Sequence, residues 1–230
     1  MKPKFNIGVF GYFGYFLAQE MNHIGRLNNM FTNLTHSRTS DISKSYKKIN
    51  RLSRFGYVIP RLGFNSSQKI NLFSMKLFDE WMARNLDNAE IYHCFSSFCT
   101  KSLEAAKRNF NSMTVVERGS SHIEFQNELL REEYDRWNIK YEPIHPEVIA
   151  REKTEYELAD YITVQSTFAE RSFLKKGISP KKLIKLPLGV DISQFKKIPK
   201  DDNIFRVFYA GNFSIRKGAM YLLKAIDGLK

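Results

Sequence analysis

Apolar residues follow two spacings along this chain, and stretches of the two kinds alternate. Short apolar runs, typical of buried strands, lie at residues 4–10, 89–95, 113–117, 161–165 and 182–186. Apolar residues three or four positions apart, typical of one helix face, lie at residues 70–82, 102–110, 121–137, 146–159 and 167–176. Because parallel strands need crossover connections, this alternation predicts an α/β fold with a doubly wound parallel sheet.

The first sixty residues are less regular. After the first strand, Gly11 and Gly14 mark a turn, and the spacing of apolar residues predicts one helix that extends to residue 31. Residues 32–54 are polar and basic and indicate a loop, and a short strand is predicted at residues 55–59.

The uncharged stretch at residues 5–19 follows two lysines and faintly resembles a signal peptide. It is too short to span a bilayer and lacks a clear small-x-small cleavage site, so a buried first strand is favoured.

The pattern changes after residue 187. A polar stretch with a glycine and a proline indicates a linker, and a new apolar run at residues 204–210 is followed by a helical pattern at 219–229. We therefore expect a complete α/β domain at residues 1–190, a linker at 191–203 and the incomplete start of a second domain, one βα unit, at 204–230.

Composition supports a folded, intracellular chain. Its 230 residues correspond to about one and a half domains. The hydrophobic fraction of 43% is ample for a core and argues against disorder. The two cysteines, Cys94 and Cys99, cannot form a disulfide framework, which favours a reducing compartment such as the cytoplasm.

The formal net charge is +12, and its distribution is uneven. Basic residues dominate residues 1–60 and 161–230, whereas acidic residues outnumber them at 111–160. Nucleic acid, an anionic membrane or a phosphorylated ligand would each suit such a charge, so the charge alone does not identify the partner.

The most specific candidate for chemistry is the turn from Gly211 to Gly218, between the predicted strand and the predicted helix. A helix start offers unpaired N–H groups and the positive end of a dipole to a phosphate. Arg216 and Lys217 add two cations there, and Gly211 permits close approach. The alternative is an ordinary βα turn with solvated basic residues; a Walker A loop is excluded, because Lys217 precedes the glycine.

His122 is the second candidate, because it follows the strand at residues 113–117, and ligands bind at the carboxyl ends of strands in open α/β sheets. At a helix start its neutral form is favoured, able to accept a proton or to hydrogen-bond a sugar hydroxyl. The alternative is a half-exposed histidine at a helix start. Ser121 and Glu124 have the spacing of a capping box for that helix.

Two other patterns carry weaker signals. Gly11 and Gly14 predict a tight turn that lets a ligand or a facing domain approach the backbone, although their spacing does not match a dinucleotide fingerprint. His93, Cys94 and Cys99 fit no usual set of metal ligands and are expected to be packing residues, so no metal site is predicted.

Four stretches together resemble the retaining glycosyltransferases of the GT-B architecture, glycosyltransferase family 4, over about residues 85–230. They are Glu117-Arg118-Gly119-Ser120-Ser121-His122, Glu155…Ala159-Asp160…Ser166, Pro187-Leu188-Gly189-Val190-Asp191…Phe195, and Tyr209-Ala210-Gly211…Arg216-Lys217-Gly218. The resemblance implies a Rossmann-like acceptor-side domain, followed by the start of a donor domain that is cut short.

By this resemblance, the protein transfers a sugar from a nucleotide-sugar to a sugar or lipid-linked acceptor, with retention and without a cofactor or catalytic metal. Lys217 would hold the donor diphosphate with Arg216, Gly211 and Gly218 around it. His122 would line the acceptor and sugar side, and Gly11 and Gly14 would form the loop facing the cleft.

The chain also departs from the family. Asn212 stands where many members have arginine after the donor-domain glycine. The Glu-x7-Glu motif that binds sugar and ribose lies deeper in the second domain than this chain extends. Glu147…Glu155 and Glu124…Glu132 have that spacing, but they precede the Lys217 turn and are expected on solvated helix faces.

The leading hypothesis is therefore a fragment of a cytoplasmic glycosyltransferase of cell-surface polysaccharide or glycoconjugate synthesis, associated with an anionic membrane face. A basic module that binds nucleic acid or an anionic surface is the alternative, although no nucleic-acid-binding signature is present. A Rossmann oxidoreductase is disfavoured, because a dinucleotide fingerprint is lacking.

Overall fold

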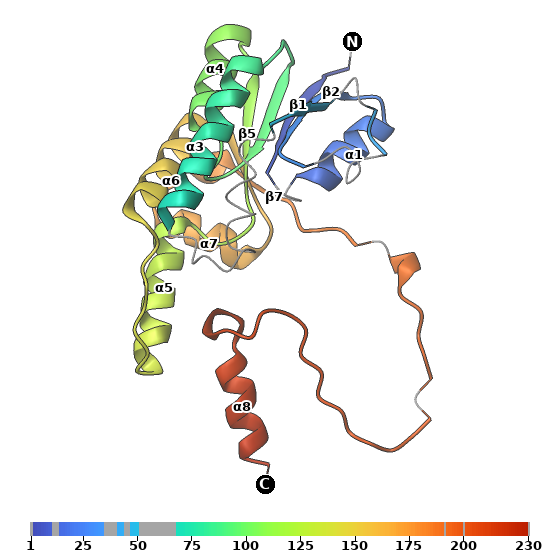
Figure 1. Ribbon diagram of the computed structural model, residues 1–230, viewed down its shortest axis with the longest axis vertical. Helices are drawn as coiled ribbons and strands as arrows, with labels where there is room; N and C mark the ends of the chain where they lie inside the picture. Colours follow the sequence, from blue (N-terminus) through green and yellow to red (C-terminus); the bar gives the residue numbers. More distant parts are fainter. Residues whose placement is uncertain are drawn as a thin grey trace.

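The protein is built around one parallel sheet of seven strands in the order β3-β2-β1-β4-β5-β6-β7 (Figure 1). The computed structural model describes residues 2–10, 14–34, 41–43, 47–50, 68–190, 192–199 and 201–229. The strands are β1 Phe5–Val9, β2 Leu27–Thr32, β3 Lys47–Ile49, β4 Ile91–Phe95, β5 Met113–Arg118, β6 Tyr161–Val164 and β7 Leu183–Lys185. Every pairing is parallel, which confirms the predicted α/β fold class.

Helices lie on both sides of this sheet, with α3, α4 and α6 together on one side and α1 on the other (Figure 1). The helices are α1 Tyr15–His23, α3 Gln68–Asn85, α4 Thr100–Phe110, α5 Ile123–Arg136, α6 Pro146–Leu158, α7 Thr167–Lys175 and α8 Ala219–Asp227. From residue 68 to residue 186, each predicted helix and strand is confirmed.

Strand alternation divides the core into two layers, because successive side chains point to opposite faces of a sheet. On β1, Ile7 and Val9 join the smaller core cluster together with Tyr15 and Ala18 of α1. Between them, Gly8 faces the other layer, where a Cβ would lie 3.0 Å from the sulfur of Met82.

The larger core cluster fills the α3, α4 and α6 side. Its fully buried members include Phe78 of α3, Leu103 of α4, Val116 of β5, Tyr156 of α6 and Phe173 of α7. Burying a side chain of this size contributes about 1.5–3 kcal/mol, so this layer supplies most of the hydrophobic stabilisation of the fold.

The predicted helix to residue 31 was wrong after His23. Gly25 has φ 68°, in the left-handed region, and the chain then forms β2, which pairs with β1. The predicted loop at 32–54 contains the short strand β3. The strand predicted at 55–59 and the turn residue Gly11 lie outside the described residues.

The strand predicted at 204–210 is not formed, whereas the helix after it is α8. Phe205 and Phe208 remain 84% and 88% exposed. A strand is stabilised by pairing with a neighbour, and residues 204–210 pair with none of the seven strands that the structure describes. The division at 1–190, 191–203 and 204–230 stays a prediction.

Within the described ranges, every helix is either too short or too polar to cross a membrane.

Candidate functional site

The sheet has a switch point between β1 and β4. From β1 the chain builds β2 and β3 outward on one side, and it then returns to place β4 on the other side of β1. Crossover connections therefore diverge at the carboxyl ends of β1 and β4, and open α/β sheets bind ligands at such a crevice. The residues around these two strand ends are the candidate site.

Gly14 forms the β1 side of this site. It is the N-cap of α1 with φ 78°, and no side chain caps this helix start. A Cβ on Gly14 would lie 3.3 Å from the carbonyl oxygen of Gly8 and 3.4 Å from the ring of Phe95. The backbone at Gly14 is therefore closely approached by Gly8 and Phe95 of the same chain. The approach of a ligand to this backbone stays a prediction.

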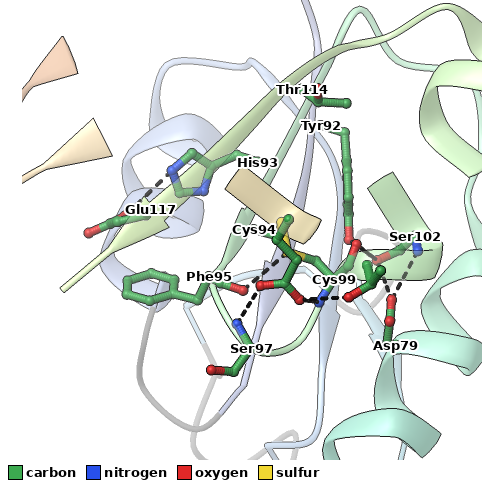
Figure 2. Close-up of a disulfide and its surroundings, with 12 residues drawn as sticks. Asp79, Tyr92, His93, Cys94, Phe95, Ser97, Cys99, Ser102, Thr114 and Glu117 are labelled. Carbon is green, nitrogen blue, oxygen red and sulfur yellow. Dashed lines mark hydrogen bonds and ion pairs between the residues drawn. A yellow bond between two sulfur atoms is a disulfide. The ribbon is translucent and has the colours of Figure 1, made fainter. Parts of the chain in front are cut away.

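Polar side chains from β4, β5 and β6 lie on the same face of the sheet as Phe95, and Figure 2 shows two of them, His93 and Glu117. His93 of β4 lies 3.4 Å from Glu117 of β5, measured from Nε2 to Oε2. The side-chain amide of Gln165 donates to Oε1 of Glu117 at 3.3 Å. On β6, Thr163 pairs in register with Glu117. This row, His93, Glu117, Thr163 and Gln165, is called the polar row below.

Burial shifts both titratable groups of the polar row toward their neutral forms. It lowers the pKa of His93 to about 4. Burial also raises the pKa of Glu117, and the hydrogen bond from Gln165 opposes that shift. His93 is therefore neutral near pH 7. Nδ1 of His93 and the hydroxyl of Thr163 are both buried, and neither has a hydrogen-bond partner among the residues that the structure describes.

The loop between β4 and α4 is held from beneath by Glu155 of α6, which is fully buried. Oε2 of Glu155 accepts from the backbone N–H of Ser97 at 2.6 Å, and Oε1 accepts from the N–H of Cys99 at 2.9 Å. Ser97 has φ 77°, which is uncommon for a residue with a side chain. Glu155 is thus buried, and the prediction that it lies on a solvated helix face was wrong.

Cys94 and Cys99 are joined by a disulfide across the same loop (Figure 2). Both are buried in the larger core cluster, as expected for packing residues. Their bonding was not predicted, because two cysteines five positions apart were judged only against a disulfide framework or a metal site. The disulfide closes a short local loop.

His122 is the N-cap of α5, where its Nδ1 accepts from the N–H of Glu124 at 3.3 Å. The capping box of Ser121 and Glu124 was therefore placed one residue too early. The His122 ring is 2% exposed and lies 5.1 Å from the rings of both Tyr156 and Phe173. Burial lowers its pKa to about 4, so it is neutral. These contacts are those of a packed helix cap, and a role of His122 toward an acceptor stays a prediction.

The basic turn lies far along the chain, at the start of α8. Gly211 has φ 137° and Gly218 has φ 73°, and Gly218 is an N-cap without a side-chain partner. Arg216 and Lys217 lie in the short 3-10 helix η6, Ile215–Lys217. At this helix start the N–H of Ala219 donates to the carbonyl oxygen of Ser214 at 3.2 Å, and the N–H of Tyr221 donates to that of Gly218 at 3.1 Å. Anion binding at Gly211, Arg216, Lys217 and Gly218 stays a prediction.

This turn packs against the end of α5. The ring of Tyr221 lies 5.2 Å from the ring of Trp137, and its hydroxyl accepts from Arg136 at 3.0 Å. Lys224 lies over the Trp137 ring at 4.5 Å. The end of α5 is therefore the place where the basic turn meets the sheet domain.

Neither a family model nor a curated protein matches this sequence. Among solved structures, the chain is similar to sucrose-phosphate synthase from Thermosynechococcus elongatus, with a TM-score of 0.55 and 15% identity. That likeness covers 98% of this chain and 59% of the other. What the two share is the fold.

Two further solved structures are similar at lower scores. A UDP-glucosyltransferase from Polygonum tinctorium has a TM-score of 0.41 and 13% identity, over 82% of this chain and 53% of the other. TcCGT1 in complex with UDP has a TM-score of 0.46 and 13% identity, over 87% and 54%. Both scores are too low to carry an argument. The chain spans between 53% and 59% of the length of these three structures.

The sequence analysis missed the polar row and the loop held by Glu155. One signal was present: Glu117 ends an otherwise apolar run, and a charged residue at the carboxyl end of a central strand is a candidate for function. No signal in the sequence paired Glu155 with Ser97, because these residues are far apart in the chain and meet only through the packing of α6 on α4.

Proposed function

We propose that this chain is the acceptor-side part, with the start of the donor side, of a nucleotide-sugar-dependent glycosyltransferase of the GT-B architecture. The observation that carries the proposal is the parallel sheet with its switch point between β1 and β4, in a chain whose fold is similar to that of sucrose-phosphate synthase over 98% of its length. The sequence motifs that resemble family 4 support the same assignment.

On the donor side, we assign the diphosphate of the nucleotide-sugar to the turn around Lys217. Lys217 and Arg216 would face the negative charge that develops on the leaving diphosphate, and the positive end of the α8 dipole would add to their field. Gly211 and Gly218 would let the phosphates approach the backbone. The proposed reaction retains the anomeric configuration and uses no metal.

On the acceptor side, we assign the acceptor to the switch point, next to Gly14; Gly11, the other glycine of this assignment, lies outside the described residues. Glu117 and Gln165 are the polar groups we place nearest the acceptor. His122 is assigned an indirect part, because its imidazole caps α5 behind the end of β5.

The wider setting that we propose is synthesis of a cell-surface polysaccharide or glycoconjugate, on an acceptor held at an anionic membrane. The net charge of +12 supports this setting. Sedimentation with phosphatidylserine vesicles, lost as salt is raised, is the expected behaviour; equal binding to neutral vesicles would contradict it.

The donor assignment is tested by a nuclear magnetic resonance titration of the ¹⁵N-labelled chain with UDP and with inorganic diphosphate. We expect amides of residues 211–218 to shift with a millimolar dissociation constant, which is about 4 kcal/mol of binding free energy. Binding should be this weak because the chain spans 59% of the length of sucrose-phosphate synthase, whose fold it shares.

Lys217→Ala should abolish most of these shifts, whereas Lys197→Ala, which removes the same charge from an exposed position after η5 (Ile192–Gln194), should leave them unchanged. Absence of shifts at residues 211–218, or equal losses in both variants, would overturn the donor assignment. Micromolar binding by this chain would contradict the expected weak affinity.

A further inference from the structure

The start of α4 borders the switch point, and its helix dipole is already matched by a carboxylate of the protein itself. Asp79 of α3 is fully buried. Its Oδ2 accepts from the N–H of Lys101 at 3.0 Å, and its Oδ1 accepts from the N–H of Ser102 at 2.9 Å. Glu155 accepts from the N–H of Cys99, the N-cap residue of α4. These N–H groups are the ones a phosphate would use at a helix start.

The two arginine side chains at this corner are also paired with carboxylates of the protein. Arg151 lies 2.8 Å from Asp79, measured from Nη2 to Oδ2, and it is largely buried. Arg118, at the end of β5, lies 3.0 Å from Oε2 of Glu152, measured from Nε. Each arginine therefore faces a buried carboxylate, and a charge held in such a pair is not available to an incoming anion without a large cost.

Among the described residues, Nε of Arg118 forms this ion pair without a hydrogen bond, and two buried atoms of the neighbouring polar row, Nδ1 of His93 and the hydroxyl of Thr163, also have no hydrogen-bond partner. If the Nε2 proton of neutral His93 points toward Glu117, Nδ1 is left as a bare acceptor. The hydroxyl of Thr163 is also unpartnered, and Glu117 keeps 16% of its side chain exposed. A hydroxyl group both donates and accepts, so it can satisfy groups of this kind, whereas an anion would meet the carboxylate of Glu117.

We propose that the β4–α4 corner of the switch point excludes anionic groups and that the neighbouring polar row takes an uncharged, hydroxyl-bearing part of the acceptor, such as a neutral sugar ring. This inference rests on the proposed function and deepens it. The two ends of the reaction are then separated by charge: phosphates go to the turn around Lys217, and neutral hydroxyls go to the sheet.

The first test is a titration of the ¹⁵N-labelled wild-type chain with inorganic diphosphate and, separately, with glucose at high millimolar concentration. Diphosphate should leave the amides of Cys99, Lys101 and Ser102 unmoved. Glucose should shift the signals of Phe95, Gly119 and the Gln165 side-chain amide. Saturable shifts of the three α4 amides with diphosphate, or no shift of the polar-row signals with glucose, would overturn the proposal.

The second test asks whether Asp79 itself fills the anion site. Asp79→Ala should lower the melting temperature, and formate should raise it again, because a small carboxylate can enter the space left at the start of α4. Asp87→Ala removes the same charge beside Lys48, away from α4, and should show no rescue. Formate must be compared with chloride at equal ionic strength. Equal effects of formate on both variants would contradict an anion site at α4.

These tests separate the two proposals. The donor assignment is read at residues 211–218, whereas the inference is read at the start of α4 and along the polar row. If diphosphate shifts no signals at residues 211–218 but glucose still shifts those of the polar row, the donor assignment fails and the neutral-ligand site stands.

Discussion

Glu155 is fully buried, yet hydrogen-bond donors surround its carboxyl group. Its two oxygens accept three hydrogen bonds, from the N–H groups of Ser97 and Cys99 and from the hydroxyl of Thr100. Burial nevertheless raises the pKa of Glu155 to about 8; Glu152 adds to the increase, while the backbone N–H groups and Arg151 oppose it. The residue therefore titrates in the range where a cell operates.

The sign of the resulting pH dependence follows from the direction of the shift. The folded state holds a proton on Glu155 between the ordinary pKa of 4.5 and the raised value of about 8. That contribution is fully present at low pH and is lost as the pH rises through 8. His93 and His122 have lowered pKa values and contribute their changes mainly below 6.5. Burial also raises the pKa of Glu117, so the part of the slope that belongs to Glu155 is found by comparing the wild type with Glu155→Gln.

Glu155→Gln should flatten this part of the profile. The wild-type free energy of unfolding is expected to fall between pH 6.5 and 8 by up to about 1.4 kcal/mol per pH unit. The variant should lack most of that fall, because glutamine does not titrate. Urea denaturation at several pH values measures both slopes. Glu147→Gln, at the start of the same helix, is the control and should keep the wild-type slope. If Glu155→Gln also kept that slope, the Glu155 carboxyl group would be charged throughout this pH range in the wild-type protein.

At the residue scale, sequence spacing alone did not predict the burial of Glu155. Glu155 and Glu147 lie eight positions apart on α6, and the pattern was assigned to a solvated face. Glu155 lies at the buried side because α6 packs on α4 there, and its burial depends on a loop more than fifty residues earlier in the chain. Long-range pairing of this kind has no local signature.

At the scale of elements, α1 is bounded by glycines with different surroundings. Gly14 precedes it at φ 78°, and Gly25 follows it at φ 68°, so both occupy the left-handed region. A Cβ on Gly14 would press on Gly8 and Phe95, whereas a Cβ on Gly25 would meet nothing within 4 Å. An added side chain would therefore strain the backbone at both positions but would press on neighbouring atoms only at Gly14.

Gly14→Ala should consequently destabilise the protein more than Gly25→Ala. The shared strain costs about 1 kcal/mol, and pressing on the floor of the switch point adds roughly 1–2 kcal/mol at Gly14. Urea denaturation of both variants gives the difference. Equal losses would mean that Phe95 moves aside freely, and the β1 side of the site would then be less rigid than the structure indicates.

The elements that the sequence predicted well are those with a long, regular pattern, from α3 to β7. The error at α1 arose because Leu27 and Phe31 continue the helical spacing by coincidence, although they lie on a strand. Gly25 was the available stop signal. The apolar run at 204–210 was predicted as a strand from its composition, but a strand also needs a neighbour, and that condition cannot be seen in a local window.

At the scale of the whole molecule, the fold class and the switch-point geometry followed from the alternation of strands and helices. The residues that occupy the site did not follow from it, apart from Gly14. The chain after β7 is a separate matter, since it runs as a long extended segment to α8 (Figure 1). Among its described residues, Ala219 alone is classed as buried.

This distribution predicts that residues 1–190 unfold with nearly the same free energy as the whole chain. Hydrophobic stabilisation follows buried area, and the residues after 191 add little of it beyond the contact of Tyr221 with Trp137. The aromatic pair is worth about 0.5–1.5 kcal/mol, and the Lys224–Trp137 and Arg136–Tyr221 contacts add about 0.5–1 kcal/mol each, so the difference should not exceed about 3.5 kcal/mol. The slope of unfolding free energy against urea should also be almost unchanged, because it scales with the surface exposed on unfolding.

Trp137→Ala in the full chain is the matched control, since it removes the same contact and should bring the full chain to the stability of 1–190. A larger loss on truncation than in this variant would show that the segment from 191 to 229 packs on the sheet domain more extensively than through the end of α5.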